Sequence, residues 1–385
     1  MKYTLSHSEI RDGIIKLCQQ FDGRYWQECD AQYAYPAKFV NALTQEGYLS
    51  ALIPETYGGL GLPLSAGAAI LEEIHRSGGN AAACHAQMYT MGTVLRHGSD
   101  IQKQRYLPEI ASGALRLQAF GVTEPGSGTD TTALRTTAIK KGDNYIVNGQ
   151  KIWTSRAEHS DLMLLLARTT PKEQVSKKTD GLSVFLVDMR EVVGTSLTIK
   201  PVRTMMNHAT TQLFFDDMAV PAANLIGEEG KGFRYILSGM NAERMLIAAE
   251  SIGDAKFFIE QATAYAGERE VFDRPIGKNQ GVQFPIARAY ADMRAAELML
   301  AEALRLYEDG QSPGEEANIA KMLAADAAMA AGEACIQTFG GFGFASEYNI
   351  ERKYREARLY QVAPISTNLI LSYIAEHVLG MDRSY

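Results

Sequence analysis

The chain has 385 residues, of which 46% are hydrophobic and 22% charged, so it is long enough for two or three domains with a large apolar core. Its formal net charge is −7, and no run of Lys or Arg forms a phosphate-binding stripe, which argues against a nucleic-acid partner. No apolar run approaches the roughly 18 residues that span a bilayer, and no signal core is visible, so we expect a cytoplasmic protein. The spacing of the cysteines argues against a disulfide scaffold or a zinc site and predicts free thiols at Cys18, Cys29, Cys84 and Cys335.

Residues 1 to about 115 have the pattern of helices. Apolar residues recur at helical spacing over 37–53, and a turn rich in Pro and Gly follows at 54–63. A second helix is predicted over 64–78. From about 118 to 228 the pattern changes to short β-rich runs separated by Gly, Asn, Asp and Pro. The runs that predict strands are 145–155, 161–169, 182–189 and 212–220.

Long helices return after a turn at 227–233. The strongest helical patterns cover 234–270 and the Ala-rich stretch 315–339. The polar stretch 170–181, between two predicted strands, is typical of a mobile surface loop. The order of these patterns predicts three domains, which are helical over 1–117, β over 118–228 and helical again over 229–385.

Several Gly-rich segments match one known family. They are FGVTEPGSGTD at 120–130, NGQKIWTS at 148–155, EREVFDRPIGKNQGVQF at 268–284 and QTFGGFGFASEY at 337–348, with shorter matches at 54–61 and 228–233. Each is weak alone, but in this order and at this spacing the sequence resembles the acyl-CoA dehydrogenase family. The resemblance implies a mainly α fold with a helical N-terminal domain, a β-barrel-like middle domain and a C-terminal four-helix bundle. It also implies FAD as the cofactor, an acyl-CoA substrate, an electron-transferring flavoprotein as electron acceptor, and a homotetramer built as a dimer of dimers.

The resemblance also implies which residues hold the cofactor. A flavin ring needs aromatic neighbours and hydrogen-bond donors, and its pyrophosphate needs a cation or exposed backbone amides. Arg269 matches the cation, and Gln337 with two glycines is expected after the Ala-rich helix, where the backbone can approach the cofactor of a neighbouring subunit. Without the resemblance, Trp153 reads as a core aromatic residue, Arg269 as a solvated side chain and Gly340 as a helix stop. The full implied set is Phe120, Val122, Thr123, Trp153, Ser155, Arg269, Phe272, Gln280, Gln337, Gly340, Gly341, Ser366 and Asn368.

The tail segment lacks the family's catalytic carboxylate. In the family a glutamate here removes the α-proton of the thioester, and its Tyr-Glu-Gly-Thr run corresponds to Ala363, Pro364, Ile365 and Ser366. Proline supplies neither a carboxylate nor an N–H donor for the thioester carbonyl, and one such donor contributes about 2.7–4 kcal/mol to transition-state stabilisation. Ile365, in place of glycine, also fills space near the acyl chain.

A second subset of the family, which includes isovaleryl-type enzymes, carries its base on another helix. The matching residue here is Glu243. Helical spacing places Met240, Leu246 and Ile247 beside it, so we expect an apolar lining around the carboxylate. Such a lining sharpens a carboxylate as a base. The alternative is that Glu243 forms a structural ion pair with an arginine.

The resemblance says less about the substrate side. His208 falls on a substrate-side loop of relatives, although a lone histidine is more often structural. Glu250 and Asp254 are poorer candidates for the base, because no family position places them over the flavin. No spacing of His, Cys and carboxylates resembles a metal site. The substrate-binding residues implied by the family are Thr129, Met240 and Arg244.

Three functions follow from these observations. The first is an FAD-dependent dehydrogenase that introduces an α,β double bond into an acyl-CoA, with Glu243 as base. The second is a reductase, desulfinase or oxidase that acts on an acyl-CoA with the same fold and cofactor. The third is a non-catalytic acyl-CoA-binding or partner-binding protein that keeps FAD for stability. The intact cofactor set argues against the third function.

Overall fold

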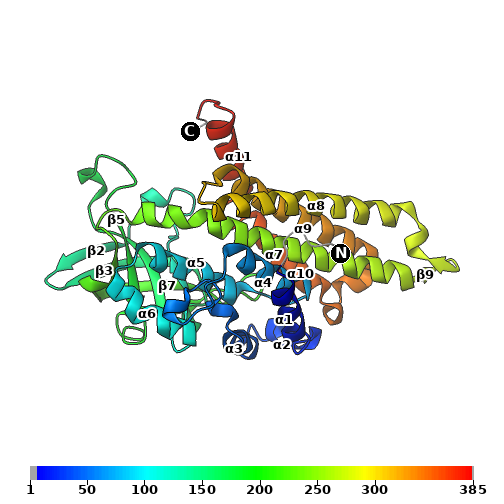
Figure 1. Ribbon diagram of the computed structural model, residues 1–385, viewed down its shortest axis with the longest axis horizontal. Helices are drawn as coiled ribbons and strands as arrows, with labels where there is room; N and C mark the ends of the chain where they lie inside the picture. Colours follow the sequence, from blue (N-terminus) through cyan, green and yellow to red (C-terminus); the bar gives the residue numbers. More distant parts are fainter. Residues whose placement is uncertain (1–6, 384–385) are drawn as a thin grey trace. The chain divides into compact units, whose positions relative to one another are not determined.

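The computed structural model describes residues 7–383 (Figure 1). The chain forms two compact units, each made of segments that are far apart in the sequence. The bundle unit comprises Met1–Gln32, Pro63–Ala81 and Asn241–Tyr385, and the sheet unit comprises Tyr33–Leu62 and Ala82–Met240. The long helix α7 (Gly232–Glu268) belongs to both units, because the boundary falls between Met240 and Asn241.

The sheet unit is built on one eight-stranded sheet. Its strand order is β6-β7-β3-β2-β4-β5-β8, and β1 pairs with β4 in parallel. The strands are β1 (Leu117–Gly121), β2 (Thr137–Lys141), β3 (Asn144–Ser155), β4 (Leu162–Arg168), β5 (Leu182–Asp188), β6 (Leu197–Pro201), β7 (Thr210–Pro221) and β8 (Leu225–Ile226). The helices of this unit are α3 (Ala37–Gln45), α5 (Ala82–His97), α6 (Asp100–Ser112) and the start of α7.

Strand β4 is buried on both faces, which explains its almost uninterrupted apolar sequence. Leu162 and Leu164 face one core, which they share with residues of α5 and α6. The alternate residues Met163 and Leu165 face a second core, which contains Tyr145 of β3 and other residues of β3 and β7. The sheet therefore curls around a core of its own, while helices cover its other face.

The bundle unit joins helices from the two ends of the chain. Within it α8 and α9 run side by side (Figure 1). The Ala-rich sequence of α9 supports this packing, since Ala317, Ala320 and Ala324 are fully buried and let neighbouring helices approach. A short hairpin of β9 (Glu270–Val271) and β10 (Arg274–Pro275) joins α7 to α8. The helices are α1 (Ser8–Cys18), α2 (Gly23–Ala31), α4 (Leu64–Arg76), α7 from Asn241 onward, α8 (Gln280–Glu308), α9 (Gly314–Phe339), α10 (Ile350–Ala357) and α11 (Thr367–Tyr373).

A buried ionic network joins four helices of the bundle unit. Lys256 of α7 is fully buried between Glu72 of α4, 2.5 Å away, and Glu297 of α8. Glu72 and Glu73 also bind the buried Arg11 of α1. Every charge in the network therefore has an opposite partner, and removing one partner would leave a buried charge uncompensated at a cost of about 3–5 kcal/mol.

A second network lies around His75 of α4. The Nε2 atom of His75 accepts a hydrogen bond from the backbone N–H of Ala81 at 3.1 Å, and Nδ1 lies 2.8 Å from Asp254 Oδ1. A backbone N–H can only donate, so Nε2 of His75 acts as the acceptor in this bond. Lys353 of α10 supplies the positive charge, since its Nζ atom lies 2.5 Å from Asp254 and 3.1 Å from Glu356. Glu250 and Asp254 are buried near this histidine, so both carboxylates lie in a structural network.

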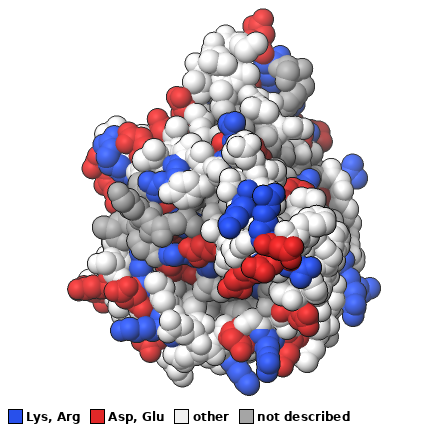
Figure 2. Space-filling model, turned by 90° about the vertical axis from the view of Figure 1, so that its right-hand side faces the viewer, with Lys and Arg blue, Asp and Glu red and all other residues white. Residues whose placement is uncertain are grey.

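The predicted order of helical, β and helical regions is confirmed. The predicted helix over 37–53 is wrong in its second half, because α3 ends at Gln45 and Gly47 takes a φ of +77° that favours glycine. All four cysteines are free thiols, as expected. Within residues 7–383, no helix has the length and apolarity needed to cross a membrane. On the face shown in Figure 2, acidic and basic side chains are mixed in small groups.

Candidate functional site

Trp153 lies at a bulge of β3, which changes the direction in which its side chain points. The register between β3 and β7 shifts between Ile152 and Thr154, and Trp153 has a φ of +62°. Bulges of this kind are common beside active sites, and a bulky residue with positive φ is strained. The side chain is 57% exposed, so the alternative interpretation as a core aromatic residue is wrong.

The loop after β1 is fastened to β3 beside Trp153. The buried ammonium of Lys151 donates to the carbonyl of Val122 at 2.9 Å and lies 2.8 Å from Glu124 Oε1. The backbone N–H of Ile152 donates to the carbonyl of Thr123, also at 2.9 Å. These bonds hold Val122 and Thr123 next to Trp153, so three of the predicted ring-binding residues come together.

Glu124 closes the same loop from the other side. Its carboxylate accepts the backbone N–H groups of Arg135 at 2.6 Å and Thr136 at 2.9 Å. Burial acts to raise the pKa of Glu124, but the Lys151 ammonium and the hydrogen bonds outweigh it and the pKa is lowered. Burial lowers the pKa of Lys151 to about 8, because Glu124 opposes it only in part. The sequence reasoning did not single out this pair.

Between these anchors the loop is open to solvent. Gly126, Gly128 and Thr129 are exposed, and no atom lies within 4 Å of the place where a Cβ would stand on either glycine. A ligand can therefore approach the backbone closely. Of the other predicted residues in the sheet unit, Phe120 packs edge-to-face with Tyr89, Ser155 pairs with Thr210 at the end of β3, and Met240 packs against the core shared with α5 and α6.

In the bundle unit, Arg269, Phe272 and Gln280 lie around the hairpin between α7 and α8. Arg269 follows directly after α7, and its carbonyl accepts the N–H of Ile276 at 2.8 Å. Phe272 has a φ of +53° and is 93% exposed. Gln280 is the first residue of α8 and is also exposed. The three side chains are therefore accessible to a ligand.

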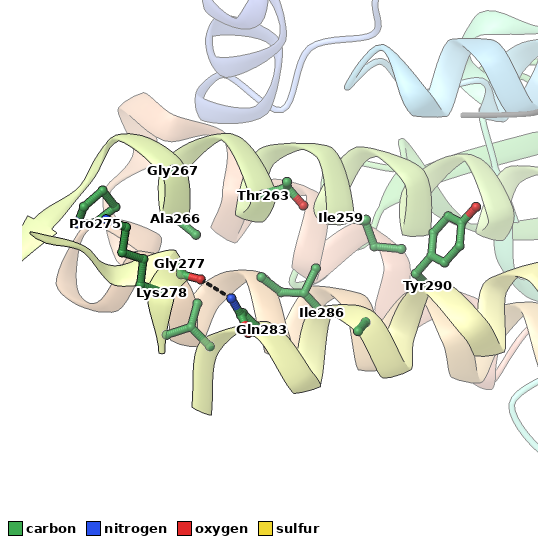
Figure 3. A pocket seen from close by; sticks show the side chains of 12 residues that line it. Ile259, Thr263, Ala266, Gly267, Pro275, Gly277, Lys278, Gln283, Ile286 and Tyr290 are labelled. Carbon is green, nitrogen blue, oxygen red and sulfur yellow. Dashed lines mark hydrogen bonds between the residues drawn. The ribbon is translucent and has the colours of Figure 1, made fainter. Parts of the chain in front are cut away.

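A separate pocket of about 550 Å³ lies between α7 and α8 beside the hairpin (Figure 3). Ile259, Ile286 and Tyr290 line it, and Gln283 Nε2 donates to the carbonyl of Gly277 at 2.6 Å at one end. None of the sequence-predicted site residues lines this pocket. Its lining is mainly apolar and carries no carboxylate.

The end of α9 differs in one detail from the expectation. Gln337 lies in the last turn of the helix rather than after it, because α9 continues to Phe339. Gly340 then takes φ +59° and ψ −131°, a conformation that is essentially restricted to glycine, and this stops the helix. No atom lies within 4 Å of a Cβ on Gly340 or Gly341. Gly340 therefore ends the helix, and the backbone of Gly340 and Gly341 has open space beside it.

The tail segment begins α11 with a serine cap. The Ser366 hydroxyl accepts the N–H of Leu369 at 3.4 Å, and its own O–H can still donate. Asn368 lies in the first turn of α11 and is exposed. The Ala363–Pro364 peptide bond before this helix is cis.

Glu243 lies on α7 in the bundle unit and is half-buried. Leu246 is fully buried and Ile247 nearly so, and Ile247 packs with Tyr360 and Ala325. Both aliphatic side chains are therefore buried on the turn of α7 that follows Glu243, and the apolar lining of its carboxylate stays a prediction.

Two cations interact electrostatically with Glu243. Arg244 donates from Nη1 to Asn241 Oδ1 at 2.9 Å, and burial lowers its pKa against the attraction of Glu243. Lys321 of α9 is fully buried, and its Nζ atom donates to the carbonyl of Ile365 at 2.7 Å. Burial lowers the pKa of Lys321 to about 8, while Asp326 and Glu243 act to raise it. The sequence reasoning missed Lys321, although a lone lysine within an Ala-rich apolar helix was the available signal.

His208 lies in the sheet unit beside Arg156. Its Nε2 atom is 3.4 Å from Arg156 Nη1. His159, which like Arg156 follows β3, stacks on Tyr35 with ring centroids 4.2 Å apart. Both histidines therefore have structural neighbours within the sheet unit. Among residues 7–383 no group of His, Cys, Asp and Glu could hold a metal ion.

The accessible groups suit a flavin dinucleotide. In the sheet unit, an exposed indole stands beside the anchored loop of Val122 and Thr123. In the bundle unit, an accessible arginine and an open Gly-Gly backbone offer a cation and amide donors. A flat ring and a dianionic pyrophosphate need these partners.

Comparison with known families and structures gives a consistent result. Three family models match, which describe the N-terminal domain of acyl-CoA dehydrogenase at residues 4–114, the middle domain at 119–218 and the C-terminal domain at 230–379. Together they span nearly the whole chain.

Individual relatives align over similar lengths. Cyclohex-1-ene-1-carbonyl-CoA dehydrogenase of Syntrophus aciditrophicus is 35% identical over 87% of this chain and 80% of its own. The 3-(aryl)acrylate reductase of Clostridium sporogenes is 31% identical over 98% of this chain and 100% of its own. A chain in a structure of the electron transferring flavoprotein of Acidaminococcus fermentans superimposes with a TM-score of 0.91 at 31% identity, covering 98% of this chain and 100% of that chain.

Proposed function

Because the chain belongs to the acyl-CoA dehydrogenase family and is an FAD-dependent enzyme that desaturates acyl-CoA, we propose that Glu243 is the base that removes the α-proton of its substrate. The family has a helical N-terminal domain, a β-sheet middle domain and a helical C-terminal domain, and this chain has the same fold. Membership also sets aside the non-catalytic alternative. We assign the protein to the branch that lacks the tail glutamate.

The observation that carries this proposal is the environment of Glu243. Its carboxylate is half-buried, with buried aliphatic side chains on the same helix and the cations Arg244 and Lys321 in electrostatic range. An ionised carboxylate in such a setting can accept a proton. In the tail segment, by contrast, Pro364 has no group that can accept one.

In the mechanism that we infer, the chain's own groups bind and orient the thioester. Thr129, Met240 and Arg244 contact the acyl-CoA, and Glu243 takes the proton from the α-carbon. FAD, when bound, supplies the acceptor for the hydrogen that leaves the β-carbon. Since Pro364 has no N–H, the thioester carbonyl must take its hydrogen bonds from other donors.

We propose cofactor-binding residues for each unit taken by itself. In the sheet unit Thr123, Trp153 and Ser155 contact the ring, helped by Phe120 and Val122. In the bundle unit Arg269 pairs with the pyrophosphate. The remaining contacts come from Phe272, Gln280, Gln337, Gly340, Gly341, Ser366 and Asn368.

Anaerobic flavin reduction tests the role of Glu243. A panel of acyl-CoA thioesters is mixed with the purified enzyme, and bleaching of the flavin identifies the best substrate. Glu243→Gln should slow bleaching by that substrate by at least about a thousandfold, since a base contributes up to about 10⁴-fold. Glu268→Gln, at the exposed end of the same helix, should behave like the wild type. Equal bleaching rates for Glu243→Gln and the wild type would overturn the assignment.

Net reduction of enoyl thioesters is a candidate for a second activity, because one relative with full coverage is a 3-(aryl)acrylate reductase. A reductase and a dehydrogenase differ in the direction of net turnover. The enzyme should therefore be assayed with saturated thioesters plus an artificial electron acceptor, and with enoyl thioesters plus a reduced electron donor. Faster turnover in the second assay would favour the reductase.

The partners of the enzyme are proposals as well. An electron-transferring flavoprotein is supported by the similarity to a chain in a structure of such a flavoprotein. A homotetramer, arranged as a dimer of dimers, is supported by exposed apolar side chains such as Phe272, Phe284 and Leu298. Sedimentation equilibrium tests the oligomer, since a monomeric mass would exclude it.

We also propose domain limits of 1–117, 118–228 and 229–385. We further propose a cytoplasmic location, in which the free thiols stay reduced.

A further inference from the structure

Lys321 of α9 is a buried cation with an unusual set of partners. Its side chain is fully buried, and within residues 7–383 its hydrogen-bond partner is the carbonyl of Ile365, 2.7 Å from Nζ. An ammonium group has three N–H donors, so two of them are not used by this bond. Its neighbours on α9, Ala320 and Ala324, are fully buried and apolar.

Two other buried lysines of the bundle unit show what Lys321 lacks. Lys256 lies between Glu72 and Glu297, and Lys353 lies within 3.1 Å of both Asp254 and Glu356. Each of these lysines is neutralised by direct ion pairs, which is the usual way to bury a charge. Lys321 has no carboxylate at ion-pair distance in the part of the chain that the structure describes. A direct ion pair with a structural carboxylate therefore does not explain why the positive charge of Lys321 is buried.

The charged groups around Lys321 come from two helices. On α7, Glu243 attracts the ammonium and Arg244 repels it. On α9 itself Asp326 attracts it, although the Asp326 carboxylate also accepts a hydrogen bond from Gln361 at 2.7 Å. From the tail segment the neighbouring polar group is the neutral carbonyl of Ile365. Burial lowers the pKa of Lys321 to about 8, so the side chain is still mainly protonated at neutral pH.

We propose that Lys321 is a positioning residue for proton abstraction, which holds the tail segment through Ile365 and places a positive charge near Glu243. The proposal rests on the assignment of Glu243 as the base. The hydrogen bond to Ile365 fixes the chain directly after Pro364, in the segment where relatives carry their glutamate. Lys321 thus binds the segment that lacks the base, and its charge acts at a distance on the proposed base of α7.

The charge has a chemical consequence for the base. Apolar surroundings favour the protonated form of a carboxyl group, and only the ionised form can accept the α-proton. A nearby ammonium favours the ionised form. Lys321 therefore keeps Glu243 ready to accept a proton at a lower pH than its apolar lining alone would allow.

Two substitutions separate the charge from the hydrogen bond. Lys321→Met removes both, whereas Lys321→Gln retains an N–H donor without the charge. For each variant, kcat/KM for the best thioester is measured from pH 5 to 9, together with the thermal unfolding midpoint. In Lys321→Met the acidic limb of the profile should move up by about one pH unit, with a loss that approaches but does not exceed about tenfold on that limb and recovery toward pH 9. Lys321→Gln should show the same displaced limb with a smaller loss of thermal stability.

Lys256→Met is the matched control, because Lys256 is equally buried but lies in a structural network. It should lower the unfolding midpoint without moving the acidic limb. A wild-type limb in Lys321→Gln, or in a folded Lys321→Met, would refute the role of the charge even if the unfolding midpoint fell. The Glu243→Gln experiment separates the two proposals. If that variant is inactive while the Lys321 variants keep the wild-type profile, only this inference fails, and if it is fully active, the base assignment fails first.

Discussion

Lys151 and Glu124 form a buried ion pair, 2.8 Å long, that fastens the loop carrying Val122 and Thr123 to the strand carrying Trp153. The pair connects two segments that both belong to the proposed flavin site. Both side chains of the pair make further hydrogen bonds. Lys151 donates to the carbonyl of Val122, and Glu124 accepts from two backbone N–H groups. The loop is therefore positioned before any ligand arrives.

Breaking this pair should weaken both the fold and cofactor binding. Lys151→Met leaves the Glu124 carboxylate without its cation, at an expected cost of about 3–5 kcal/mol in the free energy of unfolding. Urea unfolding measures this cost, and the flavin-to-protein ratio after gel filtration measures retention of FAD. The double variant Lys151→Met with Glu124→Gln should lose less than the sum of the two single losses, because the residues are coupled. Additive losses would show that the pair does not act as a unit.

The strain at Trp153 predicts a difference between two truncations. Trp153→Ala and Trp153→Gly both remove the exposed indole, so both should lose FAD. Only glycine relieves the φ of +62°, so Trp153→Gly should be more stable than Trp153→Ala by about 1 kcal/mol. The comparison requires urea unfolding of the two cofactor-free proteins. Equal stabilities would mean that the bulge relaxes in the variants.

The buried Glu356 predicts a loss of stability in acid. Burial acts to raise its pKa, but Arg352 and Lys353 outweigh it and lower the pKa to about 2. The folded protein therefore binds this proton less readily than the unfolded chain, and the stabilisation is present above the unfolded pKa of 4.5. About 3 kcal/mol should be lost as the pH falls from 4.5 toward 2. In Glu356→Gln, the dependence of the unfolding free energy on pH should be shallower in this window, and an unchanged slope would assign the acid sensitivity elsewhere.

Two glycines of α7 should respond oppositely to alanine. A Cβ on Gly253 would lie 2.4 Å from the carbonyl oxygen of Glu72 and 2.7 Å from the Cβ of His75, so Gly253→Ala should cost about 1–3 kcal/mol. Gly267, on the same helix, has no atom within 4 Å of that position. Gly267→Ala should therefore stabilise the protein by about 0.5–1 kcal/mol through helix propensity. Thermal unfolding of both variants tests whether close packing of α4 on α7 sets the difference.

The sequence predicted what depends on local periodicity. The all-apolar run of β4 and the helical spacing around Glu243 were readable, because strand and helix repeats place their residues on definite faces. The bulge at Trp153 was not readable, since it depends on the register between β3 and β7, two strands that are distant in the sequence. Lys321 was missed for a similar reason: its partner Ile365 is brought to it only by the packing of the tail segment on α9.

The Lys256 network has a consequence for how the protein is made. Glu72 and Glu73 leave the ribosome long before Lys256, which lies 184 residues after Glu72. At typical rates of synthesis this interval lasts roughly 10–40 s. During that time Arg11 and Arg76 are already translated and can pair with these carboxylates, but Lys256, which lies between Glu72 and Glu297, is still missing. We therefore expect the buried packing around Glu72 to be completed only after the second half of the chain has been synthesised.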